Sequence, residues 1–175
     1  MAINLKDVPD AVKAYLNTRV TVAVSAFTPQ AGNSVQPNET FTFSVSVTNA
    51  NAANGGINLK NVRYRIESAN PAVAKFPLLN QPGGTATPLD VVSAPVDVPL
   101  LPAGAILITP LANSDTSRLE PGETDSIVVR GVAGSAPAGG DTSIRARILA
   151  DVDLDRLFPQ NEDSPVTART LHVEG

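Results

Sequence analysis

Closely spaced carboxylates near the C-terminal end are the residues of this chain best suited to bind an ion. Asp151, Asp153 and Asp155 alternate with Val152 and Leu154. Carboxylate oxygens are the hard ligands that Ca²⁺ prefers, although this run lacks the glycine and the spaced glutamate of an EF-hand loop. We therefore expect either a calcium site or an acidic turn that solvent and nearby arginines neutralise, and no other cofactor.

The residue types needed for catalysis are sparse. His172 is the single histidine, and no Gly-x-Ser-x-Gly or Gly-rich phosphate-binding motif accompanies it. The chain has no cysteine, which excludes disulfides and thiolate metal sites. A sugar cleft lined with aromatic rings is disfavoured because there are 2 tyrosines and no tryptophan. We therefore predict no catalytic residue, and we expect His172 to be an ordinary strand residue.

Composition narrows the class of protein further. The formal net charge is -4 and the basic residues are scattered, which argues against direct binding of nucleic acid. No stretch reaches the roughly 18 apolar residues that a membrane span needs. Residues 1–20 carry charges inside any candidate apolar segment, so we expect a protein that is made in the cytoplasm and used without Sec-type export.

Two related turn-and-strand stretches indicate the fold. Pro37-Asn38-Glu39-Thr40 precedes strict alternation of apolar and hydroxyl residues through Asn49, which is typical of a half-buried strand. Pro121-Gly122-Glu123-Thr124 precedes a second apolar strand. Further strands are predicted within 19–27, 62–67, 105–109, 142–150 and 166–173. Roughly seven to nine strands are typical of an immunoglobulin-like sandwich.

The first residues differ from this pattern. Residues 3–17 read as a short amphipathic helix that would place Val8, Val12, Tyr15 and Leu16 near one face. We divide the chain into an N-terminal helical segment or docking arm, residues 1–18, and a sandwich, residues 19–175. The apolar stripe is expected either to pack on the sandwich or to bind a partner.

Residues 69–105 are rich in proline, which cannot donate to a β-ladder and so excludes long central strands. We expect short edge strands near 74–79 and 91–98. The excursion is either a binding loop or a connector between the sheets.

Several of these motifs together resemble bacterial CARDB and related immunoglobulin-like repeat families. They are the Pro-Asn-Glu-Thr opening with its Val-Ser-Val-Thr-Asn strand end at 37–49, Leu-Glu-Pro-Gly-Glu-Thr at 119–124, and Ile-Leu-Ala-Asp-Val-Asp at 148–153 followed by Phe-Pro-Gln-Asn-Glu-Asp at 158–163. The similarity spans roughly 20–174 and departs from the pattern at 69–105. It implies an all-β, immunoglobulin-like antiparallel sandwich that serves adhesion, assembly or spacing and carries out no catalysis.

The sequence thus predicts a structural or assembly protein whose partners are other proteins. The leading hypothesis is a decoration or accessory component on the surface of a virion or phage-tail-like particle, bound to copies of itself or to a capsid or tail protein. The alternative is an adhesion or carbohydrate-binding module of a bacterial cell-surface protein.

Overall fold

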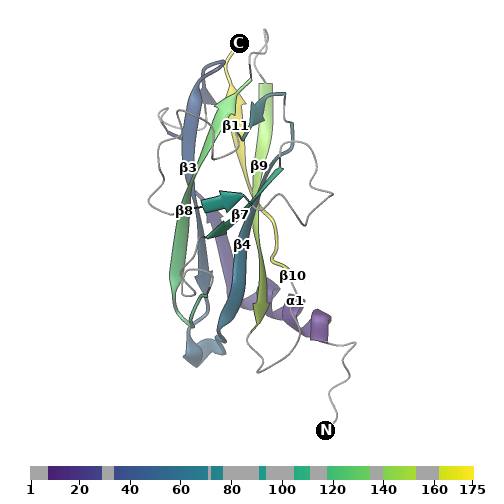
Figure 1. Ribbon diagram of the computed structural model, residues 1–175. Helices are drawn as coiled ribbons and strands as arrows, with labels where there is room; N and C mark the ends of the chain where they lie inside the picture. Colours follow the sequence, from purple (N-terminus) through teal and green to yellow (C-terminus); the bar gives the residue numbers. More distant parts are fainter. Residues whose placement is uncertain are drawn as a thin grey trace.

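The computed structural model is an elongated sandwich of two β-sheets with one helix beside it (Figure 1). It describes residues 8–28, 34–70, 72–76, 91–93, 105–110, 118–134, 140–152 and 162–175. The C-terminus lies at one end of the long axis, and the helix lies toward the other end. Among the described residues, no helix has the length and apolar character that crossing a membrane requires.

The smaller sheet has four strands in the order β1-β3-β8-β5. All of its pairings are antiparallel. Its strands are β1 (Val20–Val24), β3 (Thr40–Asn49), β8 (Thr124–Ala133) and β5 (Ala74–Lys75).

The larger sheet has seven strands, of which six follow the order β2-β11-β9-β4-β7-β6, while β10 pairs with β9. The pairing of β2 with β11 is parallel, and the other pairings in this sheet are antiparallel. Its strands are β2 (Ser34–Val35), β4 (Leu59–Ser68), β6 (Val91–Ser93), β7 (Ala105–Pro110), β9 (Gly140–Val152), β10 (Glu162–Asp163) and β11 (Thr167–Val173).

The core lies between the two sheets, as the period-two pattern predicts. Along β3 the apolar side chains are buried and the hydroxyl side chains between them are not. Phe27, Phe41 and Phe43 form an aromatic cluster, with Phe27 edge-on to both neighbours at centroid distances of 5.6 and 5.5 Å. The predicted all-β, immunoglobulin-like antiparallel sandwich with a short N-terminal helix is therefore confirmed.

The two proline turns singled out in the sequence adopt the same conformation. Asn38 and Gly122 have φ of 60° and 82°. Each turn closes with a backbone bond of 3.1 Å, from Glu39 N to Gln36 O and from Glu123 N to Glu120 O. Proline followed by a residue with positive φ defines a type II turn. In both turns the glutamate carboxylate also accepts the backbone N–H of the turn's first residue at 2.8 Å. Glu39 accepts from Gln36, and Glu123 accepts from Glu120.

The two turn-and-strand units, each a turn followed by β3 or β8, are related by an approximate twofold axis. The Asn38 N–H donates to the carbonyl of Gly134 beyond β8, and the Gly122 N–H donates to the carbonyl of Asn49 at the end of β3, both at 3.2 Å. Each turn thus secures the end of the other strand. Figure 1 shows β3 and β8 running side by side.

Removing either turn carboxylate should loosen one end of this strand pair. We expect Glu39→Ala and Glu123→Ala each to lower the free energy of unfolding by about 1 kcal/mol, because a backbone N–H loses its acceptor. Urea unfolding measures the loss. The matched Glu→Gln variants keep a side-chain oxygen and should lose less than half as much, and an equal loss would contradict this role for the carboxylates.

Part of the proline-rich region is described. Short strands occur where they were expected: β5 lies within the predicted 74–79, and β6 lies within the predicted 91–98. The choice between a binding loop and a connector falls mostly on residues 77–90 and 94–104, which lie outside the described residues.

Candidate protein-interaction surface

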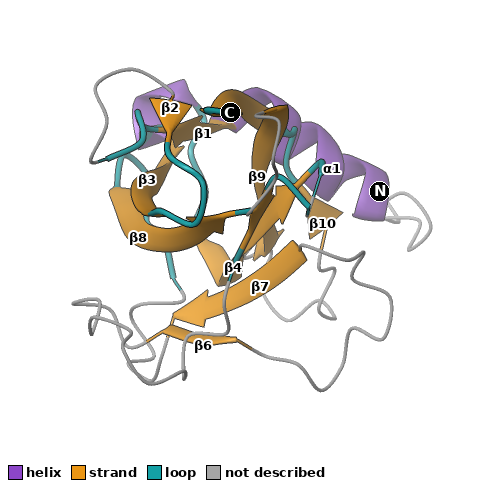
Figure 2. Ribbon diagram, turned by 90° about the horizontal axis from the view of Figure 1, so that it is seen from above, coloured by secondary structure: helices purple, strands orange, loops and turns teal. Residues whose placement is uncertain are grey.

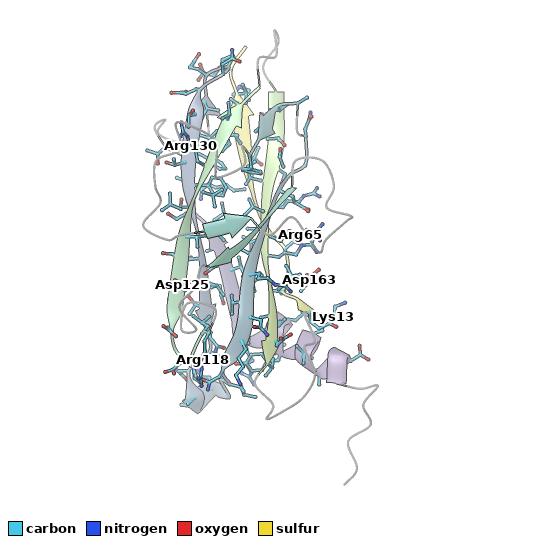
Figure 3. The ribbon with its side chains drawn as sticks, viewed as in Figure 1. Lys13, Arg65, Arg118, Asp125, Arg130 and Asp163 are labelled. Atoms are coloured by element: carbon cyan, nitrogen blue, oxygen red, sulfur yellow. The ribbon has the colours of Figure 1, made fainter. Side chains whose placement is uncertain are left out.

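The outer face of β1, β3 and β8 is built mainly of small hydroxyl side chains, and we call this surface the hydroxyl face. Its members alternate with core residues along β1, β3 and β8. They are Thr21, Ser25, Thr42, Ser44, Ser46, Thr48, Thr124 and Ser126, with Ala23 and Val128 among them. The listed residues carry no charge, but Arg130 on β8 lies directly opposite Thr42 on the same face (Figure 3).

Some hydroxyls on this face serve the fold and others remain available. Thr48 and Thr124 lie opposite each other, with their hydroxyl oxygens 2.8 Å apart. The Ser25 hydroxyl accepts the Ser44 N–H at 2.8 Å where β1 ends. By contrast, the hydroxyls of Ser46 and Ser126 have no hydrogen-bond partner within the described part of the chain. A binding partner would find both donors and acceptors there.

The outer face of the seven-stranded sheet has the opposite character. Glu67 lies among three arginines and contacts Arg65 at 3.4 Å, Arg147 at 3.7 Å and Arg145 at 3.9 Å. Arg147 also binds Asp163 on β10 at 3.1 Å. This charged face is thus an ion-pair network, and Figure 3 places Arg65 and Asp163 on the side of the molecule away from β8.

Neutralising Glu67 should expose the repulsion between these arginines. We expect Glu67→Gln to lower the free energy of unfolding by about 1–2 kcal/mol at low salt, and by less in 1 M salt because exposed charges are screened. Glu162→Gln on β10 is the control, since Glu162 has no ion pair among the described residues. A Glu67→Gln effect that matched the control or ignored salt would contradict the network.

The helix α1 (Val8–Arg19) packs on the sandwich. Val12 and Leu16 are 1% and 0% exposed and belong to the core. Of the predicted partner-binding residues, these two therefore bind their own chain, and docking them on a partner would require the helix to leave the sandwich. Tyr15 is half-buried, and the side chain of Val8 lies outside the described residues. Partner binding by this segment stays a prediction, and it requires that the helix leave the sandwich.

A buried polar cluster ties the helix to the sandwich. The Tyr15 hydroxyl lies 2.7 Å from Asn49 Oδ1 and accepts the Ile57 N–H at 2.7 Å. Asn49, 1% exposed, directs its Nδ2 toward the carbonyls of Ile57, Glu120 and Leu119 at 2.8, 3.2 and 3.3 Å. The Asn49 amide thus joins the end of β3 to helix α1 through Tyr15, to the loop at Ile57 and to the segment 119–120. Sequence analysis missed it, although an asparagine at a core-facing position of the alternation was the available signal.

Of the predicted calcium ligands, the structure places one. Asp151 belongs to β9 and not to a turn, since the strand extends past Ala150 to Val152. Its side chain accepts a 2.6 Å hydrogen bond from Asn61 Nδ2, and the residue is 7% exposed. Asp153 and Asp155 lie outside the described residues. Within the described ranges no group of acidic or histidine side chains is arranged to hold a metal, and calcium binding stays a prediction.

Ser34, His172 and Asp141 lie side by side on β2, β11 and β9, and these are the residue types of a catalytic triad. Nδ1 of His172 is 2.6 Å from Asp141 Oδ1, but Ser34 makes no hydrogen bond to the ring. The histidine and aspartate side chains are 50% and 68% exposed. Water therefore reaches the whole row, and His172 and Asp141 form an exposed side-chain contact.

One buried contact crosses the sandwich. The Tyr64 hydroxyl on β4 donates to Asp125 Oδ2 on β8 at 2.9 Å. Burial, reinforced by the Asp125 charge and this hydrogen bond, raises the pKa of Tyr64 far above its usual value. Asp125, like Asn49, is a polar residue at a core-facing position, and its partner could not be known without the strand order.

The Tyr64 pKa predicts alkaline sensitivity. Because Tyr64 keeps its proton in the folded state and loses it in the unfolded state above about pH 10, stability should fall there by up to about 1.4 kcal/mol per pH unit. Tyr64→Phe should lack this contribution, and near pH 7 it should lower the free energy of unfolding by about 1–2 kcal/mol. Urea unfolding between pH 8 and pH 11 tests it. Identical alkaline slopes in both proteins would overturn the assignment.

The comparisons with known proteins concern the fold. No protein-family model and no curated protein sequence matches this chain. Among solved structures, AvmM, which catalyses macrocyclization in alchivemycin A biosynthesis, is 14% identical, with 91% of this chain and 90% of that chain covered and a TM-score of 0.52. CaCohA2 from Clostridium acetobutylicum is 12% identical, with 91% and 93% covered and a TM-score of 0.50.

A third match is the CARDB domain of a Pyrococcus furiosus protein, at 14% identity with 89% and 96% covered and a TM-score of 0.41. The two antiparallel sheets, together with the matches to AvmM and CaCohA2, show an immunoglobulin-like β-sandwich fold, and the predicted resemblance is confirmed at that level. At such identities the likeness shows the fold alone.

Proposed function

We propose that this chain is a non-catalytic protein-binding module that serves assembly or adhesion through its hydroxyl face. The observation that carries this proposal is the contrast between the two outer faces. One face bears a half-buried ion-pair network, and the other presents uncharged hydroxyls over the width of β1, β3 and β8.

Such a face favours association for physical reasons. Covering its centre around Ser46 and Ser126 requires no desolvation of a charged group, which is the main penalty when ionic surfaces are buried. Its short side chains also avoid the loss of up to about 2 kcal/mol of rotamer entropy that each buried lysine or glutamate costs. Absence of charge is typical of the centre of protein interfaces, and hydroxyls without partners add hydrogen bonds of either polarity.

For the biological setting we propose decoration of a virion or phage-tail-like particle, with copies of this chain or a capsid or tail protein as partners. Repetition on a particle would multiply weak contacts through avidity. Adhesion at a bacterial cell surface is the alternative, and it uses the same face. Neither setting requires a cofactor.

The test places charge on the hydroxyl face. Ser46→Arg combined with Ser126→Arg should abolish retention of the tagged chain on its particle or envelope fraction, measured by co-sedimentation in a density gradient. Thr170→Arg is the control, because Thr170 is exposed on β11 of the other sheet.

The gradient fraction in which the chain is recovered also distinguishes particle decoration from cell-surface adhesion. Recovery with particles supports decoration, and recovery with washed envelopes supports adhesion. A chain that stays in the soluble fraction, or a double variant that is retained as well as the control, would contradict binding through this face.

A further inference from the structure

The middle of the outer face of β4 and β9 holds more positive than negative charge. Its cationic side chains, which we call the arginine patch, are Arg63, Arg65, Arg145 and Arg147. Two carboxylates, Glu67 and Asp163, contact the patch, so four arginines minus two carboxylates leave a surplus of two positive charges. Figure 2 shows β9 and β10 on the side of the sandwich away from β3 and β8, which carry the hydroxyl face.

The surplus lies at the Arg63 end of the patch. Glu67 contacts the other three arginines, and Asp163 contacts Arg147. Within the described part of the chain Arg63 forms no ion pair, and Leu149 separates it from Asp163 in the strand register. At the other end of β9 the Asp141 carboxylate contacts His172 and not the patch.

Two features of the patch are unfavourable in the chain by itself. Arg65 stands directly opposite Arg147 in the pairing of β4 with β9, and like charges at opposite positions destabilise a sheet. In addition, the Nε atoms of Arg63 and Arg65 are buried and have no hydrogen-bond partner, which also costs stability. Folds keep unfavourable local arrangements mainly at functional sites, so the patch is a candidate binding site for an anion.

The guanidinium groups can be reached from outside. The side chains of Arg65, Arg147 and Arg145 are 22%, 21% and 48% exposed, and Arg63 is half-buried. Solvent therefore reaches the patch although the buried Nε atoms lie beneath its surface. A ligand that approaches from solvent meets the guanidinium groups before it meets the backbone of the sheet.

We propose that the arginine patch binds an acidic segment of another protein in an extended conformation. Guanidinium groups pair with carboxylates through two parallel hydrogen bonds. In an extended chain the side chains on one side repeat about every 6.8 Å, and Arg63 and Arg65 repeat along β4 with the same period. Carboxylates at alternate positions of the partner would therefore meet first Arg63 and then the opposed pair of Arg65 and Arg147.

The charge outside the patch favours a short acidic segment over a long polyanion. The whole chain carries -4, so subtracting the surplus of +2 leaves -6 on the remaining residues. That charge repels a polymer that extends beyond the patch, whereas a segment with a few carboxylates stays within it. The inference goes beyond the function proposed above, because it concerns the opposite face and a second partner, and failure of either proposal leaves the other standing.

The test measures binding of a fluorescein-labelled peptide of six Glu-Ser repeats to the full chain by fluorescence anisotropy. We expect saturable binding at low salt that weakens about tenfold or more in 0.5 M salt, because salt screens exposed ion pairs. A peptide of six Gln-Ser repeats should not bind. In NMR spectra of the same titration, the amide signals of Arg63, Arg65 and Arg147 should shift, and those of Ser46 and Ser126 on the hydroxyl face should not.

A pair of variants with the same charge change locates the site. Arg63→Gln should weaken peptide binding about fivefold or more, because it removes one guanidinium from the patch, and it breaks no ion pair among the described residues. Arg118→Gln is the control, since Arg118 is exposed and lies far from Arg65 in Figure 3. It should keep the affinity within about twofold. Thermal unfolding checks that both variants keep the fold.

Four results would overturn the proposal. The first is a wild-type chain that does not bind the Glu-Ser peptide. The second is equal weakening by Arg63→Gln and Arg118→Gln, which would mean that overall charge alone attracts the peptide. The third is a set of NMR shifts that leaves out Arg63, Arg65 and Arg147. The fourth is tighter binding of a single-stranded oligothymidylate of equal charge, which would mean that the patch selects phosphate polymers and not acidic protein segments.

Discussion

Replacing Asn49 by alanine should lower the free energy of unfolding by about 2–4 kcal/mol, because it leaves several buried polar groups without partners at once. The carbonyl of Ile57 would lose a donor at 2.8 Å, and the hydroxyl of Tyr15 would lose an acceptor at 2.7 Å. No water reaches this position easily, since Asn49 is 1% exposed. Urea unfolding with an unchanged m-value measures the loss.

Asn54→Ala is the matched control, because Asn54 is an exposed asparagine in the adjoining 3-10 turn, Ala52–Asn54. It should change stability by less than about 0.5 kcal/mol. Adding Tyr15→Phe to Asn49→Ala should cost less than the sum of the single changes, since the two side chains share a hydrogen bond. A loss below 1 kcal/mol for Asn49→Ala would show that the cluster does not hold the helix to the sandwich.

Gly131→Ala should lower the free energy of unfolding by about 3 kcal/mol through overpacking. Gly131 lies opposite Phe41 in the β3–β8 pair, and a Cβ there would be 2.2 Å from the Phe41 ring. The ring cannot move aside readily, because it is fully buried beside Phe27 and Phe43. Thermal and urea unfolding both report the change.

A double variant shows whether the ring is the cause. In a Phe41→Leu background the added methyl group has room, and Gly131→Ala should then cost less than about 1 kcal/mol. Gly140→Ala is the control, since a Cβ there meets Val73 Cγ2 at 3.4 Å. If Gly131→Ala were equally harmful in both backgrounds, backbone conformation and not the aromatic contact would explain the glycine.

Much of the fold could be predicted from the sequence because it is encoded over short distances. Alternation along residues 40–49 separates the core side from the solvent side of β3 without reference to any other strand. Proline followed by asparagine or glycine, then glutamate, predicts a turn that both Pro37 and Pro121 begin. The all-β class follows from these signals.

The candidate surface could be predicted only in part. The sequence shows that the solvent side of residues 40–48 is made of serine and threonine. It does not show that β1 and β8 flank this strand and extend the same chemistry into one face. Likewise the apolar stripe of the helix was evident, but its burial against the sandwich depends on where the helix is placed.

The sequence by itself therefore determined the strands, the turns and which side of each strand is apolar, since these follow from neighbours along the chain. Only the tertiary structure decided which strands adjoin. That arrangement brings Tyr64 to Asp125 across the core and Asn49 to three carbonyls. It also brings side chains of β11 to the edge of β1. The physical reason is that strand order rests on contacts between residues far apart in sequence, which no local periodicity encodes.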